Sequence, residues 1–443
     1  MGAFVKAQGF SWRHASRSLP VLREVSFEVL PGEKVLLTGP SGSGKSTLLA
    51  AIAGLLANQD EGEQQGSLDI GDATVGMVLQ DPDSQVIASR VGDDVAFGCE
   101  NLRIPRDEIW PRVRQALSLV GLDLPLDHPT KRLSGGQKQR LALAGVIAMG
   151  ADLILLDEPT ANLDPEGQRE VVSALNHVAE ETGATIIIVE HNHELWSEFA
   201  TKFLRVSRSG GIDEISVTEL PPRPKLPPSL RAGDVDLLTA NDLLTRWGPS
   251  RSFRIPMGSS TVITGRNGVG KSTLALTLAG LIPPKRGELK LHPFLADGLV
   301  KPPHKWSSKD LASRIGMVSQ DPEHQFVART VEEELMVGER VTGRENPSRR
   351  GELLERLRLT HLRDANPFSL SGGEKRRLSV GAALVVSPRL LILDEPTFGQ
   401  DEETFVELVS LLREIVNSGT TVISVTHDPY FIASLGDHRV EVL

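Results

Sequence analysis

The chain has 443 residues, which at roughly 150 residues per domain indicates two or three domains, and two is the simpler count. Lys and Arg number 48 against 58 for Asp and Glu, so the formal net charge of -10 argues against a chain-wide attraction to nucleic acid or anionic lipid. The single cysteine, Cys99, excludes an intrachain disulfide and a cysteine-built metal site, and a reducing compartment fits.

The first 17 residues, MGAFVKAQGFSWRHASR, lack the apolar core of a signal peptide. No run of about 18 uncharged apolar residues occurs along the sequence. The richest stretch, LALAGVIAMGADLILL from Leu141, is interrupted by Gly150 and Asp152, so we interpret it as a helix followed by a buried strand. We expect neither a signal peptide nor a membrane-spanning segment.

The short apolar stretch KVLLTG, residues 34–39, is predicted to be a buried strand and leads into GPSGSGKST, which matches the pattern G-x-x-x-x-G-K-[ST]. Glycines let the backbone turn its amides toward phosphate oxygens, and the helix that follows points its positive end at them. We predict that Lys45 reaches the β and γ phosphates of a nucleotide and that Ser46 binds Mg²⁺. The residues expected to bind ATP in this loop are Gly39, Gly42, Ser43, Gly44, Lys45, Ser46 and Thr47.

Two further predicted strands of this half end in side chains that could bind a metal ion or act in catalysis. The stretch ADLILLDEPT from Ala151 ends in Asp157 and Glu158, where Asp157 would hold Mg²⁺ through water and Glu158 would polarise an attacking water. The stretch GATIIIVEH from Gly183 ends in His191. A lone histidine after a strand is usually structural, so His191 needs further support.

The same motifs recur in the second half, in the same order and at offsets between 226 and 240 residues. The pairs are Lys45 and Lys271, Gln80 and Gln320, Ser134 and Ser371, Asp157 and Asp394, and His191 and His427. The second loop would bind ATP through Gly265, Gly268, Val269, Gly270, Lys271, Ser272 and Thr273, with Ser272 and Asp394 at Mg²⁺ and Glu395 as the second catalytic carboxylate. Strands that alternate with helices predict a parallel α/β sheet in each of two copies of a whole domain.

The proline-rich stretch ELPPRPKLPPSLRAGD lies between the copies. Its prolines lack amide donors and favour extended backbone, so we interpret it as a linker. The predicted division is a first domain at residues 1–218, a linker at 219–234 and a second domain at 235–443. An insertion in the second half is expected within residues 292–310, as a surface loop.

The stretches LSGGQKQR from Leu133 and LSGGEKRR from Leu370 resemble the signature motif of the ATP-binding cassette (ABC) ATPases. The order of the other motifs is similar to that family over nearly the whole chain except the linker. The resemblance implies an α/β fold with two tandem P-loop NTPase domains, each with a parallel core sheet, an antiparallel subdomain and a helical signature subdomain. It also implies ATP hydrolysis with Mg²⁺.

The resemblance further implies that the two domains associate head to tail, so that each ATP lies between one phosphate loop and the other domain's signature motif. The signature residues are Ser134, Gly135, Gly136, Ser371, Gly372 and Gly373. Gln80 and Gln320 would complete the Mg²⁺ shell, and His191 and His427 would stabilise the transition state. The family's aromatic platform for adenine would be Trp12 in the first domain and Trp247 in the second, although a packing role for Trp247 is an open alternative.

The second half departs from the pattern at two places. PTANLD, with Asp164, becomes PTFGQD, with Asp401, and the signature has Glu374 where the first half has Gln137. These changes put equal turnover in doubt, but neither removes a lysine, serine or glutamate from a site. We expect both sites to hydrolyse ATP.

The stretches GMVLQDPDSQV and GMVSQDPEHQF resemble the ATPases of energy-coupling factor importers and their cobalt and nickel relatives. The resemblance implies two membrane partners, a transmembrane coupling protein and a substrate-capture protein, and a peripheral position on the cytoplasmic side of the cell membrane. Residues 81–85 and 321–325 would contact the coupling protein, unless they are only helix-capping turns. A tandem sugar importer ATPase and a soluble ABC protein acting on ribosomes are the alternatives, and the cargo stays open among a vitamin, a vitamin precursor, cobalt and nickel.

Overall fold

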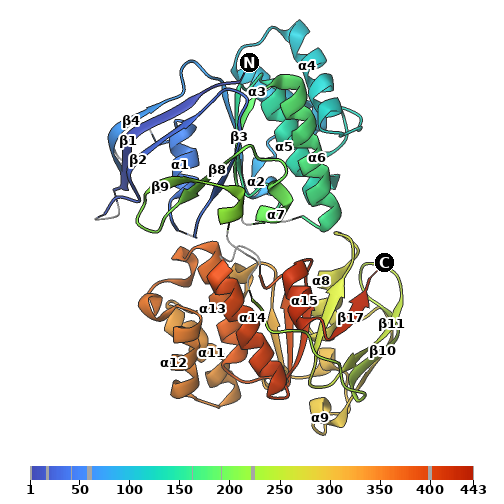
Figure 1. The fold of residues 1–443 in the computed structure, drawn as a ribbon. Coiled ribbons are helices and arrows are strands. Elements are labelled where there is room, and N and C mark those ends of the chain that lie inside the picture. Colours follow the sequence, from blue (N-terminus) through green and yellow to red (C-terminus); the bar gives the residue numbers. More distant parts are fainter. Residues whose placement is uncertain are drawn as a thin grey trace. The chain divides into compact units, whose positions relative to one another are not determined.

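The computed structural model describes residues 2–15, 19–40, 42–56, 62–161, 163–190, 192–220, 225–397 and 402–442. The chain divides into two compact units, residues 1–222 and 223–443, which we call the first and second domains. In each domain a central sheet is covered on one face by most of the helices, and on the other face by a three-stranded sheet and the helix that follows the glycine loop (Figure 1). The predicted fold class, two tandem α/β domains with parallel core sheets, is confirmed.

The strands of the first domain are β1 (Val5–His14), β2 (Leu22–Val29), β3 (Lys34–Thr38), β4 (Gly62–Asp69), β5 (Val75–Val78), β6 (Leu153–Asp157), β7 (Thr185–Val189), β8 (Lys202–Val206) and β9 (Ile212–Ile215). Its helices are α1 (Lys45–Ile52), α2 (Pro82–Gln85), α3 (Val91–Asn101), α4 (Arg106–Leu119), α5 (Gly135–Ala148), α6 (Pro165–Thr182) and α7 (His193–Trp196), with 3-10 turns η1 (Thr130–Arg132) and η2 (Val217–Glu219).

The strands of the second domain are β10 (Asp236–Leu244), β11 (Arg251–Pro256), β12 (Ser260–Thr264), β13 (Arg286–Leu291), β14 (Ile315–Val318), β15 (Leu390–Asp394), β16 (Thr421–Val425) and β17 (His438–Glu441). Its helices are α8 (Lys271–Leu278), α9 (Pro293–Ala296), α10 (Ser308–Ala312), α11 (Val331–Thr342), α12 (Pro347–Arg356), α13 (Gly372–Leu384), α14 (Glu402–Asn417) and α15 (Pro429–Leu435). The 3-10 turns are η3 (Pro303–Lys305), η4 (Pro322–Gln325), η5 (Thr360–Leu362) and η6 (Pro367–Ser369).

The central strands are continuous apolar runs because both of their faces are covered. In β6, Ile154 and Leu156 pack into the core formed with helices α3 to α6. Leu153 and Leu155, which point to the other face, pack into the core formed with α1 and the three-stranded sheet. The same alternation along β15 and β16 divides the second domain into two cores.

The three-stranded sheets have the orders β2-β1-β4 and β11-β10-β13, and both are antiparallel. A bulge interrupts the same point of β1 and β10, where Gly9 and Asp242 have positive φ angles of 56° and 46°. The Gly9 amide donates to the Ser26 hydroxyl, and the Asp242 amide donates to the Ser252 hydroxyl, each at 2.9 Å. These bulges fix which residues of the two sheets are equivalent.

The insertion of the second domain is partly packed rather than a free surface loop. It carries α9, η3 and α10, and it buries Leu295 and Trp306 in the core beside the three-stranded sheet. The Trp306 indole nitrogen also donates to the Lys301 carbonyl at 2.6 Å. Burial of these two side chains gives the inserted segment a fixed position on the domain.

The predicted linker includes residues that contact the second domain. The Ser434 hydroxyl donates to the Pro227 carbonyl, and the Leu230 amide donates to Asp437 Oδ1. Asp437 in turn forms a buried, bidentate ion pair with Arg413, at 2.8 and 2.9 Å. The carboxylate therefore ties α14, the segment before β10 and the start of β17 together.

None of the helices in the described part of the chain is both long and apolar enough to cross a membrane.

Replacing Asp437 with Asn should destabilise the second domain, because it leaves the Arg413 charge buried without its counter-ion. We expect the free energy of unfolding of this domain to fall by about 3 kcal/mol. Urea denaturation followed by circular dichroism measures the loss, and the data need a model with two transitions because each domain has its own core. Arg358→Gln, which breaks an exposed pair with Glu403, is the control and should cost less than about 1 kcal/mol.

Candidate functional site

Neighbouring strands of the central sheet end in the four sequence motifs of the second domain. The strand order is β14-β15-β16-β12-β17, and the pairs from β14 to β12 are parallel. Gln320 follows β14, Asp394 and Glu395 end β15, His427 follows β16, and the glycine loop follows β12. Parallel strands bring their carboxyl ends to one edge, so these residues share that edge.

The first domain repeats this arrangement with the order β5-β6-β7-β3-β8-β9. Gln80 follows β5, Asp157 and Glu158 end β6, and the glycine loop follows β3. His191, predicted at the end of β7, lies outside the described residues, as do Ser41 of the loop and Asp401 of the second domain. The described motifs of both domains therefore occupy corresponding strand ends.

Each glycine loop wraps around the ammonium group of its own lysine. Lys45 Nζ donates to the carbonyls of Gly39 and Pro40 at 2.8 and 3.0 Å. Lys271 Nζ donates to those of Gly265 and Arg266 at 2.7 and 3.0 Å. Both lysines are buried, with 6% and 7% exposure, so a cation lies within each loop, where a phosphate would be attracted.

The loops need glycine at their first position. Gly39 and Gly265 have φ angles of 142° and 145°. A Cβ atom would lie 2.3 Å from the Val206 carbonyl oxygen at Gly39 and 2.1 Å from the Val442 carbonyl oxygen at Gly265. A side chain at either position would therefore push the loop off the neighbouring strand.

Both candidate catalytic glutamates have strained backbone. Glu158 and Glu395 have φ angles of 48° and 49°, a left-handed conformation that is uncommon for residues other than glycine. Each main-chain amide donates to a carbonyl at the end of the neighbouring strand. Glu158 donates to the Val189 carbonyl at 2.9 Å, and Glu395 donates to the Val425 carbonyl at 2.8 Å. Strain repeated at equivalent positions is typical of functional sites.

In the first domain, Gln80 Nε2 donates to Glu158 Oε2 at 2.7 Å, so the structure brings these two predicted site residues into direct contact. In the second domain, burial and, to a lesser degree, the negative charge of Asp394 raise the pKa of Glu395 to about 7, while Lys271 opposes the shift. A carboxyl with such a pKa can accept a proton near neutral pH.

The residues around Asp394 fit a magnesium ion. Asp394 is 3% exposed, and its Oδ1 atom has no hydrogen-bond partner among the described residues. Burial raises the pKa of this carboxyl, and a hydrogen bond from Ser272 lowers it. A carboxylate and a hydroxyl are oxygen ligands of the kind that Mg²⁺ prefers, and an otherwise unsatisfied buried oxygen is where such an ion would be bound.

The signature serines begin helices. Ser134 precedes α5 and Ser371 precedes α13, and both are exposed. Gln137 Oε1 accepts the Ser134 amide at 2.9 Å, and Glu374 Oε2 accepts the Ser371 amide at 2.8 Å. The Glu374 departure therefore preserves the capping box, because both side chains accept the same kind of bond.

A second glutamine, absent from the predicted catalytic set, closes the segment after each first glutamine. Gln85 Oε1 accepts the Leu79 amide at 2.8 Å, and Gln325 Oε1 accepts the Ser319 amide at 3.1 Å. Gln325 also accepts the Ser379 hydroxyl at 2.6 Å. The contact of residues 81–85 and 321–325 with a coupling protein stays a prediction, and within each domain the side chains of these two glutamines hold the segment itself.

Acids in the same segments pair with the signature helices. Lys138 forms an ion pair with Asp83, and Lys375 forms one with Glu323 at 2.5 Å. The motif Q-D-P-[DE]-x-Q therefore meets the signature helix in both domains.

The geometry is at odds with Trp12 as an adenine platform. Its indole is 2% exposed and belongs to the core around α1, so it has no free face for a base. The bulge alignment pairs His14, not Trp12, with Trp247, and both follow an arginine. His14 Nε2 lies 3.3 Å from the Thr47 hydroxyl of the phosphate loop.

Trp247, in contrast, is 63% exposed and lies against the second phosphate loop. A Cβ atom added to Gly270 would lie 2.8 Å from the Trp247 carbonyl oxygen. Its ring is thus available beside the loop. The shared arginine before His14 and Trp247 is the signal that could have identified His14 from the sequence.

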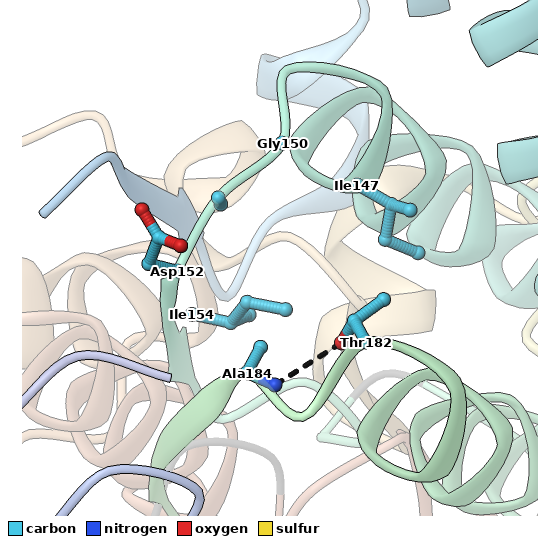
Figure 2. A pocket seen from close by; sticks show the side chains of 7 residues that line it. Ile147, Gly150, Asp152, Ile154, Thr182 and Ala184 are labelled. Atoms are coloured by element: carbon cyan, nitrogen blue, oxygen red, sulfur yellow. Dashed lines mark hydrogen bonds between the residues drawn. The ribbon is translucent and has the colours of Figure 1, made fainter. Parts of the chain in front are cut away.

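A small cavity of about 180 Å³ in the first domain lies away from these residues. It is lined by Ile147, Gly150, Ala151, Asp152, Ile154, Thr182 and Ala184 (Figure 2). Asp152 and Ala184 precede β6 and β7, so the cavity is at the amino end of the strands. It is therefore not part of the candidate nucleotide site.

Gln85→Ala should loosen the segment after β5, because the Leu79 amide loses its acceptor. We expect hydrogen exchange at Leu79 to become roughly tenfold faster, as the loss of about one hydrogen bond implies. Hydrogen exchange measured by mass spectrometry tests this, with the exposed Gln115→Ala on α4 as the control. Unchanged exchange at Leu79 would show that Gln85 does not hold the segment.

Comparisons with known proteins agree on the family. The family model described as "ABC transporter" matches residues 22–161 and 250–398. The protein of Bacillus subtilis (strain 168) named "Putative HMP/thiamine import ATP-binding protein YkoD" is 34% identical, over 98% of this chain and 88% of its own length. An Enterococcus faecalis (strain ATCC 700802 / V583) protein named "Putative ABC transporter ATP-binding protein" is 31% identical, over 96% of this chain and 86% of its own length.

Among solved structures, the complex of archaeal ribosome recycling factor aABCE1 with ribosomal stalk protein aP1 matches with a TM-score of 0.70. The match covers 98% of this chain and 87% of that one at 20% identity, which is a likeness of fold. Together the two domain matches and the full-length relatives show that the chain belongs to the ABC transporter family, as an ATPase with two ATP-binding domains in tandem.

Proposed function

We propose that the chain is the ATP-hydrolysing subunit of a membrane importer of the energy-coupling factor type. The observation that carries the proposal is the repeated segment Q-D-P-[DE]-x-Q, which in both domains is closed by its second glutamine and paired with the signature helix. The name of the Bacillus subtilis relative supports a thiamine-type precursor as the cargo. Other vitamins, cobalt and nickel are the competing cargoes.

Each proposed ATP site uses one domain's phosphate loop, acidic strand end and glutamine. Lys45 or Lys271 would bind the β and γ phosphates. Ser46, Asp157 and Gln80, or Ser272, Asp394 and Gln320, would hold Mg²⁺, which supplies charge neutralisation at the phosphates. The signature residues, Ser134 to Gly136 and Ser371 to Gly373, would complete the site of the other domain, as the family resemblance implies.

In this proposal the glutamates act as bases. Glu158 or Glu395 accepts a proton from the attacking water, and the raised pKa of Glu395 suits that role. His191 and His427 would stabilise the transition state from the ends of the adjacent strands. Adenine would stack on Trp247 in the second domain and on His14 in the first, in place of Trp12.

The proposed contact with the transmembrane coupling protein lies on the segments that follow Gln80 and Gln320. Ile87 and Val327, seven residues after Gln80 and Gln320, are exposed at 62% and 76%. Apolar side chains exposed at the same point of both domains suit a transmembrane coupling protein, which works with a substrate-capture protein. The chain would then be peripheral on the cytoplasmic side of the cell membrane, without a role for nucleic acid.

The fold likeness to the ribosome recycling factor does not favour a ribosomal function. At 20% identity it supports the fold of two cassette domains in one chain and nothing about a partner.

Glu158→Gln and Glu395→Gln should each remove one hydrolytic site. We expect each single variant to keep about half of the ATPase rate and the double variant to lose nearly all of it. Steady-state phosphate release by the purified full chain measures these rates. If one single variant abolishes turnover while the other has no effect, the two-site proposal fails.

Ile87→Asp combined with Val327→Asp should weaken the membrane contact, because a charge in an apolar interface core is costly to bury. We expect the variant to move from the membrane fraction to the soluble fraction of cells that express the importer. Val300→Asp is the matched control, since Val300 is 98% exposed in the insertion. Membrane recovery that equals that of the parent would contradict the proposed contact.

A further inference from the structure

Arg376 is a buried cation beside the second catalytic strand end. It lies on α13, five residues after the signature serine, and is 2% exposed. Its guanidinium donates from Nη1 to the Ser319 carbonyl at 2.6 Å and to the Asp394 carbonyl at 3.3 Å, and from Nη2 to the Gln320 carbonyl. One side chain therefore bridges the ends of β14 and β15.

These two strand ends carry the candidate magnesium ligands of the second domain, Gln320 and Asp394. A charged donor makes stronger hydrogen bonds than a neutral one, and the planar guanidinium holds several acceptors in a fixed geometry. Burial excludes water as an alternative partner for the three carbonyls. The relative position of the two ligand-bearing segments is thus set by Arg376 in addition to the sheet.

The first domain has no such bridge at the corresponding position. Gln139 replaces the arginine, with the same 2% exposure. Its Nε2 atom donates to the Leu79 carbonyl at 3.3 Å, and its Oε1 atom has no partner among the described residues. The neutral Gln139 amide, with one long hydrogen bond, constrains the strand ends less than the Arg376 guanidinium, which makes three hydrogen bonds.

We infer that Arg376 is a positioning residue that presets Gln320 and Asp394 for Mg²⁺, and that the two ATP sites consequently differ in their need for Mg²⁺. The inference rests on the proposed two-site ATPase. It concerns a residue outside the phosphate loop, the acidic strand end and the signature residues themselves. The second site, with Arg376, should be half-saturated at a lower Mg²⁺ concentration than the first site, with Gln139.

The test uses the full chain in two backgrounds, Glu158→Gln, which leaves the second catalytic glutamate, and Glu395→Gln, which leaves the first. Arg376→Gln introduces the residue type that the first domain has at this position. Arg376→Lys keeps the positive charge but lacks the planar guanidinium that donates to several acceptors. Two readouts apply: hydrogen exchange without nucleotide at the Ser319 amide, which donates to Gln325 Oε1 at 3.1 Å, and the Mg²⁺ concentration that half-saturates ATP hydrolysis. Arg356→Gln, which breaks ion pairs with Glu407 and Glu414 elsewhere in the domain, is the matched control.

In the Glu158→Gln background, we expect Arg376→Gln to speed exchange at the Ser319 amide and raise the half-saturating Mg²⁺ concentration, each by roughly tenfold, as the loss of one charged hydrogen bond implies. The KM for ATP should change by less than about twofold, because the phosphate loop is untouched. Arg376→Lys should fall between parent and Arg376→Gln. Unchanged exchange and Mg²⁺ dependence, or equal shifts in Arg356→Gln, would overturn the inference.

If Arg376→Gln does not fold, the reciprocal variant Gln139→Arg in the Glu395→Gln background decides. A severalfold lower half-saturating Mg²⁺ concentration supports the inference, and an unchanged value overturns it. A parent chain that hydrolyses no ATP would contradict the proposed function instead, while hydrogen exchange at the Ser319 amide would still report on the bridge.

Discussion

The parallel pairing of the central strands is the constraint on which the candidate sites depend. Because the strand pairs are parallel, the glutamine, the acidic pair, the histidine and the glycine loop lie at one edge, although up to 162 residues separate them in the second domain, from Gly265 to His427. The pairing of Asp394 with Val425 and of Ile263 with Val425 places the acidic pair two strands from the loop. Both faces of the sheet are covered, so this edge and its opposite are the positions left for chemistry.

The two domains share local hydrogen-bonding arrangements even where the residue types differ. Glu374 and Gln137 close the same capping box, and Gln85 and Gln325 hold equivalent backbone amides. Arg376 and Gln139 differ in kind, since one bridges two strand ends and the other makes one long bond. The two domains are therefore copies in architecture that differ in how firmly their strand ends are held.

The motifs and their strand and helix context were predictable from the sequence, because short apolar runs before glycine loops and acidic pairs leave few alternatives. The burial of Trp12 was not, since a bulge at Gly9 shifts which residues of β1 face the loop, and Trp12 packs into the core. The hydrogen bond of Gln85 to the Leu79 amide could not be predicted either, because a polar residue after a strand is equally compatible with a contact on the surface. The packed insertion depends on Leu295 and Trp306 reaching a core that spacing alone does not locate.

The number of MgATP molecules bound per chain tests the central claim most directly. Equilibrium dialysis of the double variant Glu158→Gln, Glu395→Gln, in which hydrolysis should not deplete the ligand, would measure this number. The account predicts two molecules per chain, and one when either Lys45→Ala or Lys271→Ala is added. A single molecule per chain, unaffected by one of the lysine substitutions, would contradict the presence of two nucleotide sites.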